Sequence, residues 1–157
     1  MSAPAVTRQY CTFWADGLYF GVAVTDVQEV LRHQEMSSAP RAPESVRGLL
    51  NLRGQIVTAI DLRHRLGLTA RDPGTPAMNV VVRSRGEVVS LLVDDIGDVI
   101  DTAGAELEPV PSTLQPSLRD AVTGVIPLPE AILLVLEADR AADTAVSATN
   151  RNPGGNS

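Results

Sequence analysis

Hydrophobic runs and turn residues alternate most clearly between residues 48 and 63. This segment reads without a break as a strand, a tight turn, a second strand and the start of a helix. Arg53-Gly54 supplies the turn, and the apolar run from Ile56 to Ile60 is typical of a strand. Asp61 can cap a short helix that Gly67 ends. The pattern indicates a scaffold, because nothing in it looks like a reacting group.

The chain contains two copies of this kind of pattern. Residues 11–31 align with residues 80–100 at an offset of 69, and residues 48–61 align with residues 124–137 at an offset of 76. The copies of 11–31 read as strand, turn and strand, with a glycine in each turn that permits the positive φ of a tight hairpin. The change of offset indicates about seven extra residues, which we place in the Pro-rich stretch 108–112.

The two copies predict two small β-barrels, each made of several short strands. This arrangement is economical because closing a sheet removes its exposed edges. Chance similarity between two amphipathic hairpins is the alternative interpretation. Residues 25–31 fit either a short helix, with Thr25 and Gln28 as a capping box, or a continued strand. We predict the helix, with Val27, Val30 and Leu31 turned inward.

Composition favours one all-β domain. The chain has 157 residues and only 3% aromatic residues, so its core must be built from aliphatic side chains, and the many valines and isoleucines favour strands. The apolar run 131–136 is too short to span a bilayer, and residues 1–9 contain no apolar stretch of the signal-peptide type. We therefore expect a cytoplasmic protein, which agrees with the single cysteine, Cys11.

Charge excludes several function classes. All 13 basic residues are arginine, and the absence of lysine excludes P-loop phosphate binding, Schiff-base chemistry and Lys-activated serine nucleophiles. The net charge of −6 argues against nucleic-acid binding. Residues 41–71 hold six arginines against two acids, whereas residues 87–139 hold eleven acids against one arginine. Two oppositely charged surfaces suit docking between proteins, and a solvated surface is the alternative.

The residues offer no convincing active site. A cysteine nucleophile would need Cys11 beside His33 or His64, but Cys11 lies in a predicted strand in line with Phe13, which favours a small buried side chain. No Gly-x-Gly-x-x-Gly or nucleophile-elbow pattern occurs in the sequence. We predict no catalytic residue and no cofactor. Four clustered acids lack the spacing of a calcium loop, so we predict no metal site and interpret them as solvated strand ends: Asp94, Asp95, Asp98 and Asp101.

Four groups of residues carry a family resemblance: Val27-Gln28-Glu29-Val30, Asn51-Leu52-Arg53-Gly54, Asp61-Leu62-Arg63, and Leu92-Val93-Asp94 with Asp98-Val99. Together they resemble the CheW family, the coupling proteins that join bacterial chemoreceptors to the histidine kinase CheA. The resemblance covers residues 8–140. It implies an all-β fold with short helices, built as two intertwined SH3-like five-stranded β-barrel subdomains that share an apolar groove. We expect residues 1–7 to be a flexible N-terminus and residues 141–157 a disordered tail.

The resemblance implies a non-enzymatic chemotaxis scaffold that is recruited to membrane receptor arrays without inserting into the membrane. Its partners would be the cytoplasmic tip of a chemoreceptor, which is a methyl-accepting chemotaxis protein, and the regulatory domain of CheA. The matching motifs also imply an ion pair between Glu29 and Arg53 beside the partner site. The receptor-binding and kinase-binding residues carried over are Val27, Glu29, Leu31, Asn51, Arg53, Gly54, Met78 and Val99.

Two other functions fit the sequence. A CheW-like adaptor could serve a different receptor–kinase pathway that controls motility or another output. An enzyme or ligand-binding barrel could use the groove, although the expected groove residues are aliphatic. The chain departs from the family pattern at Thr58, at Ser90, at residues 124–126 and in the turn 127–129, which leaves the shape of one barrel edge open.

Overall fold

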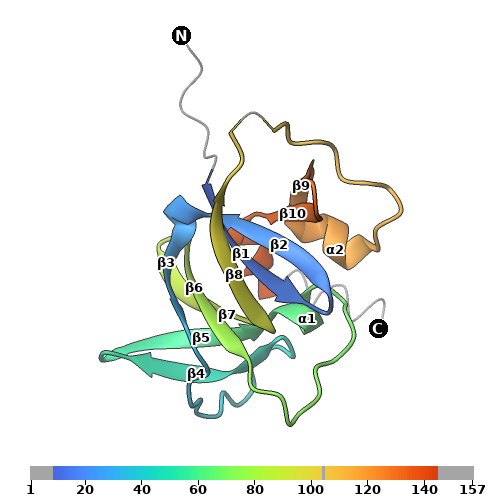
Figure 1. Ribbon diagram of the computed structural model, residues 1–157. Helices are drawn as coiled ribbons and strands as arrows, with labels where there is room; N and C mark the ends of the chain where they lie inside the picture. The colour runs from blue at the N-terminus through green and yellow to red at the C-terminus, as the bar shows by residue number, and fades with distance from the viewer. Residues whose placement is uncertain (1–8, 104, 145–157) are drawn as a thin grey trace.

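Ten strands form two five-stranded sheets in the computed structural model, which describes residues 9–103 and 105–144. The first sheet has the order β8-β1-β2-β10-β9 and is called the β1 barrel; the second has the order β3-β6-β7-β5-β4 and is called the β6 barrel (Figure 1). The strands are β1 (Gln9–Ala15), β2 (Leu18–Ala23), β3 (Val27–Leu31), β4 (Val46–Leu52), β5 (Gln55–Asp61), β6 (Met78–Ser84), β7 (Glu87–Val93), β8 (Asp95–Asp101), β9 (Val122–Pro127) and β10 (Ile132–Leu136).

The two halves of the chain are intertwined. The β1 barrel takes β1 and β2 from the first half and β8, β9 and β10 from the second half. The β6 barrel has the reverse composition, with three strands from the first half and two from the second. The pairs β2–β10 and β5–β7 are parallel, and the other named pairs are antiparallel. The predicted fold class is therefore confirmed.

In each sheet, a backbone bridge joins the segment after one edge strand to the strand at the opposite edge. In the β6 barrel, Ser37 and Leu49 exchange two hydrogen bonds of 2.8 Å, which join the segment after β3 to β4. In the β1 barrel, Glu108 and Val125 exchange bonds of 2.7 and 2.9 Å, which join the segment after β8 to β9. The repeat at offsets of 69 and 76 is thus a structural repeat. Most of the extra residues follow Glu108, in the connection that contains helix α2 (Pro116–Ala121).

Three hairpin turns have the conformation that the sequence predicts. Each places two successive residues at positive φ, the geometry of a type I′ turn, with glycine second. The φ values lie between 52° and 88° in the three pairs Asp16-Gly17, Arg53-Gly54 and Arg85-Gly86.

The largest core cluster lies between the two sheets and takes buried residues from both. Phe13 and Phe20 of the β1 barrel stack there with ring centroids 5.9 Å apart, and Val80 and Leu91 of the β6 barrel are fully buried in the same cluster. Each sheet also buries a separate cluster drawn from its own strands. Strands β6 and β7 are therefore buried on both faces, which explains their continuous apolar runs.

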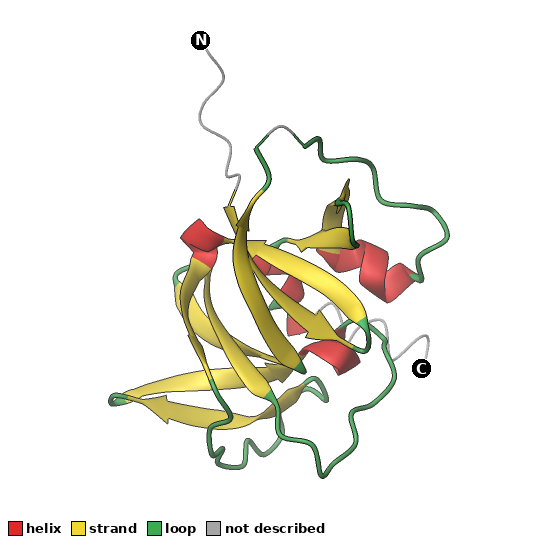
Figure 2. Ribbon diagram, viewed as in Figure 1, coloured by secondary structure: helices red, strands yellow, loops and turns green. Residues whose placement is uncertain are grey.

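Helix α1 (Leu62–Arg65) begins as predicted. The Asp61 carboxylate accepts a hydrogen bond from the backbone N–H of His64 (3.4 Å), and Gly67 follows the helix with a φ of 72°. The α-helices lie at one end of the molecule (Figure 2), where the buried Arg65 donates to Asp120 at the end of α2 and to the Arg140 carbonyl of α3 (Ala138–Ala141). Arg65 thus holds three helices together.

Two expectations about local structure need correction. Residues 24–26 form a 3-10 turn, η1 (Val24–Asp26), but Val27–Leu31 is a strand that pairs with β6, so the predicted helix over 25–31 is wrong. β-branched side chains and the open edge of β6 favour the strand, and Val30 points outward with 42% exposure. The expected tail begins within α3, where Ala141 is buried. Residues 1–7 and 145–157 lie outside the described residues.

Within the part of the chain that the structure describes, no helix is both long enough and apolar enough to cross a membrane.

Candidate functional site: the partner-binding surface

The hairpin between β4 and β5 presents the predicted Asn51-Leu52-Arg53-Gly54 motif at its tip, and it projects away from the rest of the molecule (Figure 1). The Asn51 side-chain oxygen accepts a hydrogen bond from the backbone N–H of Gly54 (2.9 Å). This bond fixes the turn in which both central residues have positive φ. Leu52 is buried beneath the turn, and the Arg53 side chain is 70% exposed. The motif therefore presents the Arg53 side chain to solvent from a turn whose backbone is fixed by the Asn51–Gly54 hydrogen bond.

The predicted ion pair between Glu29 and Arg53 is confirmed. Arg53 Nη2 lies within hydrogen-bond reach of Glu29 Oε2, and the pair joins β3 to the end of β4. These strands lie at opposite ends of the β6 sheet order, so the ion pair also helps to close the barrel. An exposed pair of this kind contributes under about 1 kcal/mol to stability. Its main effect is to orient the guanidinium beside β3.

The other predicted site residues are only partly brought together. Val27 and Met78 are half-buried at the border of the core cluster between the barrels, and Leu31 packs against the separate core of the β6 barrel. Val99 is 57% exposed, but it lies on β8 of the other sheet. The space between the barrels is filled by buried side chains, and a receptor groove along its border remains a prediction.

Exposed hydrophobic residues show a signal that the sequence reasoning missed. Of the seven large hydrophobic residues exposed in the described part of the chain, six form equivalent pairs across the internal repeat. Val30 corresponds to Val99 and Ile56 to Ile132, with exposures of 42% and 57% and of 62% and 59%. The third pair is Met36 and Leu107, which precede the two bridging residues and are 39% and 52% exposed. Each barrel therefore displays three apolar side chains at equivalent positions.

Two glycines support the third pair. A Cβ atom on Gly48 would lie 3.0 Å from Met36 Cβ, and one on Gly124 would lie 2.6 Å from Leu107 Cγ. Gly48 and Gly124 occupy equivalent positions in β4 and β9. Each apolar side chain thus rests on a glycine backbone. The offsets of 69 and 76 contain this information, because they align the members of the first two pairs.

The motif residues Arg63 and Asp94 form an ionic cluster between the barrels. Arg63 Nε and Nη2 donate to the two oxygens of Asp94 (3.1 and 2.5 Å), and Arg71 Nη2 donates to Asp94 Oδ1 (3.2 Å). The backbone N–H of Asp16, in the β1–β2 turn, donates to Asp94 Oδ2 (2.8 Å). Asp94 therefore links the β1 barrel to helix α1 and to the loop before β6.

The electrostatics of this cluster keep both partners ionised. Burial on its own raises the pKa of Asp94, but the hydrogen bonds from Arg63, from the Asp16 backbone and from Arg71 bring the pKa below its ordinary value. The hydrogen bond to Asp94 raises the pKa of Arg63. The interpretation of Asp94 as a solvated strand end is therefore wrong. Asp94 is a structural anchor for the relative placement of the barrels.

A row of Ser45, His64 and Glu44 has the residue types of a catalytic triad. Ser45 Oγ lies 2.9 Å from His64 Nδ1, and His64 Nε2 lies 3.5 Å from Glu44 Oε1. However, Ser45 is 1% exposed, and a nucleophile must be open to its substrate. The row instead connects the start of β4 to α1.

Other candidate chemistry is also weak. Cys11 is half-buried, and burial raises the pKa of its thiol, which disfavours the reactive thiolate. Among residues 9–103 and 105–144, no three His, Cys, Asp or Glu side chains are grouped as a metal site would need.

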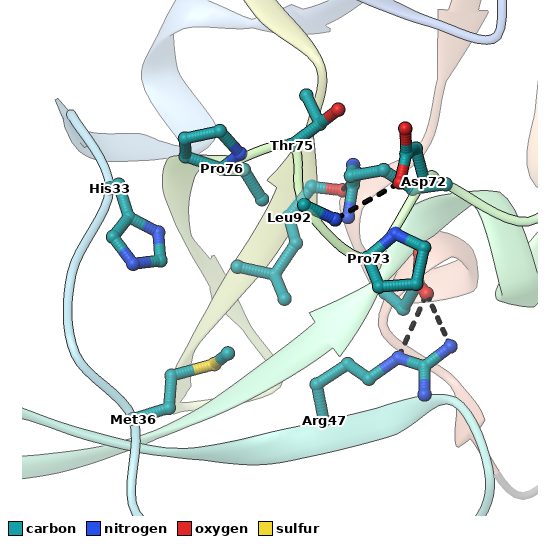
Figure 3. Close-up of a pocket in the computed structure, with 12 residues that line it drawn as sticks. His33, Met36, Arg47, Asp72, Pro73, Thr75, Pro76 and Leu92 are labelled. Atoms are coloured by element: carbon teal, nitrogen blue, oxygen red, sulfur yellow. Dashed lines mark hydrogen bonds and ion pairs between the residues drawn. The ribbon is translucent and has the colours of Figure 1, made fainter.

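A pocket of about 470 Å³ lies between the segment after β3 and the loop before β6 (Figure 3). His33 and Met36 lie on one side of it, and Pro73 and Pro76 belong to the loop opposite. Arg47 also lines it, but its guanidinium donates to the buried Asp61 carboxylate (2.9 Å). Arg47 and Asp61 are therefore engaged with each other, and none of the predicted site residues lines this pocket.

The departure from the family pattern at Ser90 has a local explanation. The fully buried Ser90 hydroxyl donates to the side-chain oxygen of Asn79 (2.7 Å), and the Asn79 amide donates to the Arg32 carbonyl (3.1 Å). The two polar side chains satisfy each other inside the β6 barrel.

Comparisons with known proteins agree with this geometry. Residues 9–146 match the family model described as a CheW-like domain. The chemotaxis protein CheW of Rhizobium meliloti is 27% identical over 132 residues, which cover 84% of this chain and 85% of that protein. The CheW of Bacillus subtilis is 25% identical over 131 residues, which cover 83% and 84%. The crystal structure of the scaffolding protein TtCheW from Thermoanaerobacter tengcongensis superposes with a TM-score of 0.76 at 24% identity, covering 88% of this chain and 94% of that chain.

Proposed function

Because the chain belongs to the CheW-like domain family, we propose that it is a non-enzymatic adaptor that couples chemoreceptors to the histidine kinase CheA. The family assignment supports a role in chemotaxis, since the matched relatives carry the names of chemotaxis proteins. We further propose that one face of the protein binds a receptor and another face binds the kinase.

The observation that carries this proposal is the equivalent display of apolar residues on the two barrels. Solvent-exposed aliphatic side chains have no role in the core of the protein that bears them. The presence of isoleucine at the equivalent positions 56 and 132, each about three-fifths exposed, supports two docking faces of similar composition. An adaptor needs at least two such faces, because it must hold two partners at once.

The face around the β4–β5 hairpin combines apolar and ionic groups. Val27, Glu29 and Leu31 alternate along β3 with exposed residues, and Arg53 reaches over from the hairpin tip to Glu29. Apolar side chains on this face can be buried against a helical partner, and the oriented guanidinium beside them can fix the direction in which that helix lies. We propose that this face, with Asn51, Gly54 and Met78, binds the receptor or the kinase, and that Val99 extends the contact on β8.

The proposed mechanism is assembly without bond-making chemistry. The adaptor would favour one state of the kinase over another if its contacts are stronger in that state. Arg63 and Asp94 would contribute by fixing the angle between the two docking faces.

A bridging experiment tests this proposal. Immobilised receptor tip fragments should retain the regulatory domain of CheA when this protein is present and retain much less in its absence. Retention that does not depend on the protein would contradict the proposal. Binding of the protein to neither partner would favour an adaptor for a different receptor–kinase pathway.

A further inference from the structure

A second pocket, of about 490 Å³, lies on the β1 barrel away from the β4–β5 hairpin. Trp14 of β1 and Tyr19 of β2 contribute an aromatic pair to its wall, with ring centroids 4.4 Å apart. Asp98 and Asp101 of β8 and Glu130 of the β9–β10 turn contribute three carboxylates. Trp14 is 37% exposed, and it is the exposed large hydrophobic residue that has no apolar counterpart in the other barrel, where Arg83 takes its place.

The charges in this pocket are uncompensated. None of its lining residues is basic, and Asp98, Asp101 and Glu130 make no ion pair with any residue in 9–103 or 105–144. Asp101 accepts one backbone hydrogen bond from Ala103 (2.8 Å). Aromatic faces beside unpaired carboxylates form a favourable site for a planar cation, which can stack and accept charge-assisted hydrogen bonds at the same time.

The internal repeat indicates that the cation suited to this pocket is a guanidinium. Asp98 corresponds to Glu29 at the offset of 69, and Pro129 corresponds to Arg53 at the offset of 76. The strand registers agree, since Val30 of β3 pairs with Val80 of β6 as Val99 of β8 pairs with Cys11 of β1, and Val80 corresponds to Cys11 at the offset of 69. In the β6 barrel Arg53 supplies a guanidinium to Glu29. In the β1 barrel the turn carries proline, so the equivalent carboxylate receives no guanidinium from this turn and pairs with none among the described residues.

We propose that this pocket receives an arginine side chain from a partner protein. The guanidinium would pair with Asp98, as Arg53 pairs with Glu29, and would stack on the Trp14–Tyr19 face with Glu130 nearby. The inference does not depend on which receptor or kinase the adaptor serves. It assigns to the β1 barrel a polar docking point that is distinct from the apolar pairs.

The single tryptophan of the chain makes the test specific to this pocket, because Trp14 gives the only indole N–H signal in a nitrogen-15 correlation spectrum. Uniformly labelled full-length protein is titrated with a blocked Gly-Arg-Gly peptide. The control peptide contains citrulline, which keeps the shape of arginine without its charge. The arginine peptide should shift the Trp14 signal to saturation with a Kd on the order of millimolar. The citrulline peptide should shift it little.

Two variants of equal charge complete the test. Asp98→Asn should raise the Kd about fivefold, whereas Glu87→Gln, which removes an exposed acid outside the pocket, should leave it unchanged. Equal shifts by both peptides, or equal effects of both variants, would overturn the proposal. A Trp14 shift that grows with protein concentration in the absence of peptide, and that Arg53→Gln abolishes, would show that the occupant is a second copy and would overturn assignment to a partner.

Discussion

Replacement of Asp94 by asparagine tests whether the ionic cluster fixes the two barrels to each other. The Asp94 carboxylate accepts two hydrogen bonds from Arg63, one from Arg71 and one from the Asp16 backbone, and the side chains of Asp94 and Arg63 are 22% and 15% exposed. An asparagine of the same shape removes the charge and one acceptor, which leaves Arg63 with only the more distant Asp16 carboxylate (3.6 Å) and takes from Arg71 the carboxylate it pairs with. Loss of one partner of a fully buried pair costs about 3–5 kcal/mol, and partial exposure lowers the expected cost to about 2–3 kcal/mol.

Urea unfolding followed by Trp14 fluorescence measures this cost. Asp95→Asn is the matched control, since Asp95 is exposed and its carboxylate accepts only from the backbone N–H of Ile96 (2.9 Å). The control should change the free energy of unfolding by less than about 0.5 kcal/mol, and Asp94→Asn should lower the melting temperature by about 4–10 °C. If the two variants differ by less than about 0.5 kcal/mol, the cluster does not anchor the barrels.

The remaining predictions concern pH, the apolar pairs and the supporting glycines. Because the folded-state pKa of Asp94 lies below its ordinary value of 3.8, the stability difference between wild type and Asp94→Asn should be constant above about pH 5 and should shrink as pH falls below about 4. A difference that stays constant or grows as pH falls below about 4 would contradict this assignment. Ile56→Asp and Ile132→Asp should each weaken binding of one partner at least about tenfold in calorimetric titrations without lowering the melting temperature, and unchanged affinity for both partners would refute the two-face account. Gly124→Ala should destabilise the protein by about 1–3 kcal/mol in urea because its Cβ would lie 2.8 Å from the Glu108 carbonyl oxygen; Gly74→Ala, in an open loop, should cost much less, and equal costs would remove the steric argument.

Local features of the fold could be predicted because their signals are local. The turn at Arg53-Gly54 and the cap at Asp61 follow from residue types that few other conformations accommodate. The exchange of strands between the halves is not local, since each half carries the same pattern and could have paired with itself. Only the family resemblance predicted it. The strand at Val27–Leu31 was mistaken for a helix because its partner, β6, lies about 50 residues further along the chain.

Only part of the candidate site could be predicted from the sequence. The ion pair between Glu29 and Arg53 followed from two motifs that the resemblance placed together. The exposed pairs were missed because an isoleucine in a strand pattern is ordinarily read as core, and exposure depends on which face the barrel closes over. The role of Asp94 was missed because its partners, Arg63 and Arg71, are brought to it by the helix and loop between β5 and β6.

Calorimetric binding of the Arg53→Asp variant to a receptor tip fragment and to the regulatory domain of CheA tests the central claim most directly. Arg85→Asp is the matched control, because Arg85 occupies the same position of another type I′ turn and its side chain is 65% exposed. The account predicts that Arg53→Asp weakens binding of at least one partner about tenfold or more, while Arg85→Asp binds both partners like wild type and both variants remain folded. Wild-type affinity of Arg53→Asp for both partners would contradict a docking face at the β4–β5 hairpin.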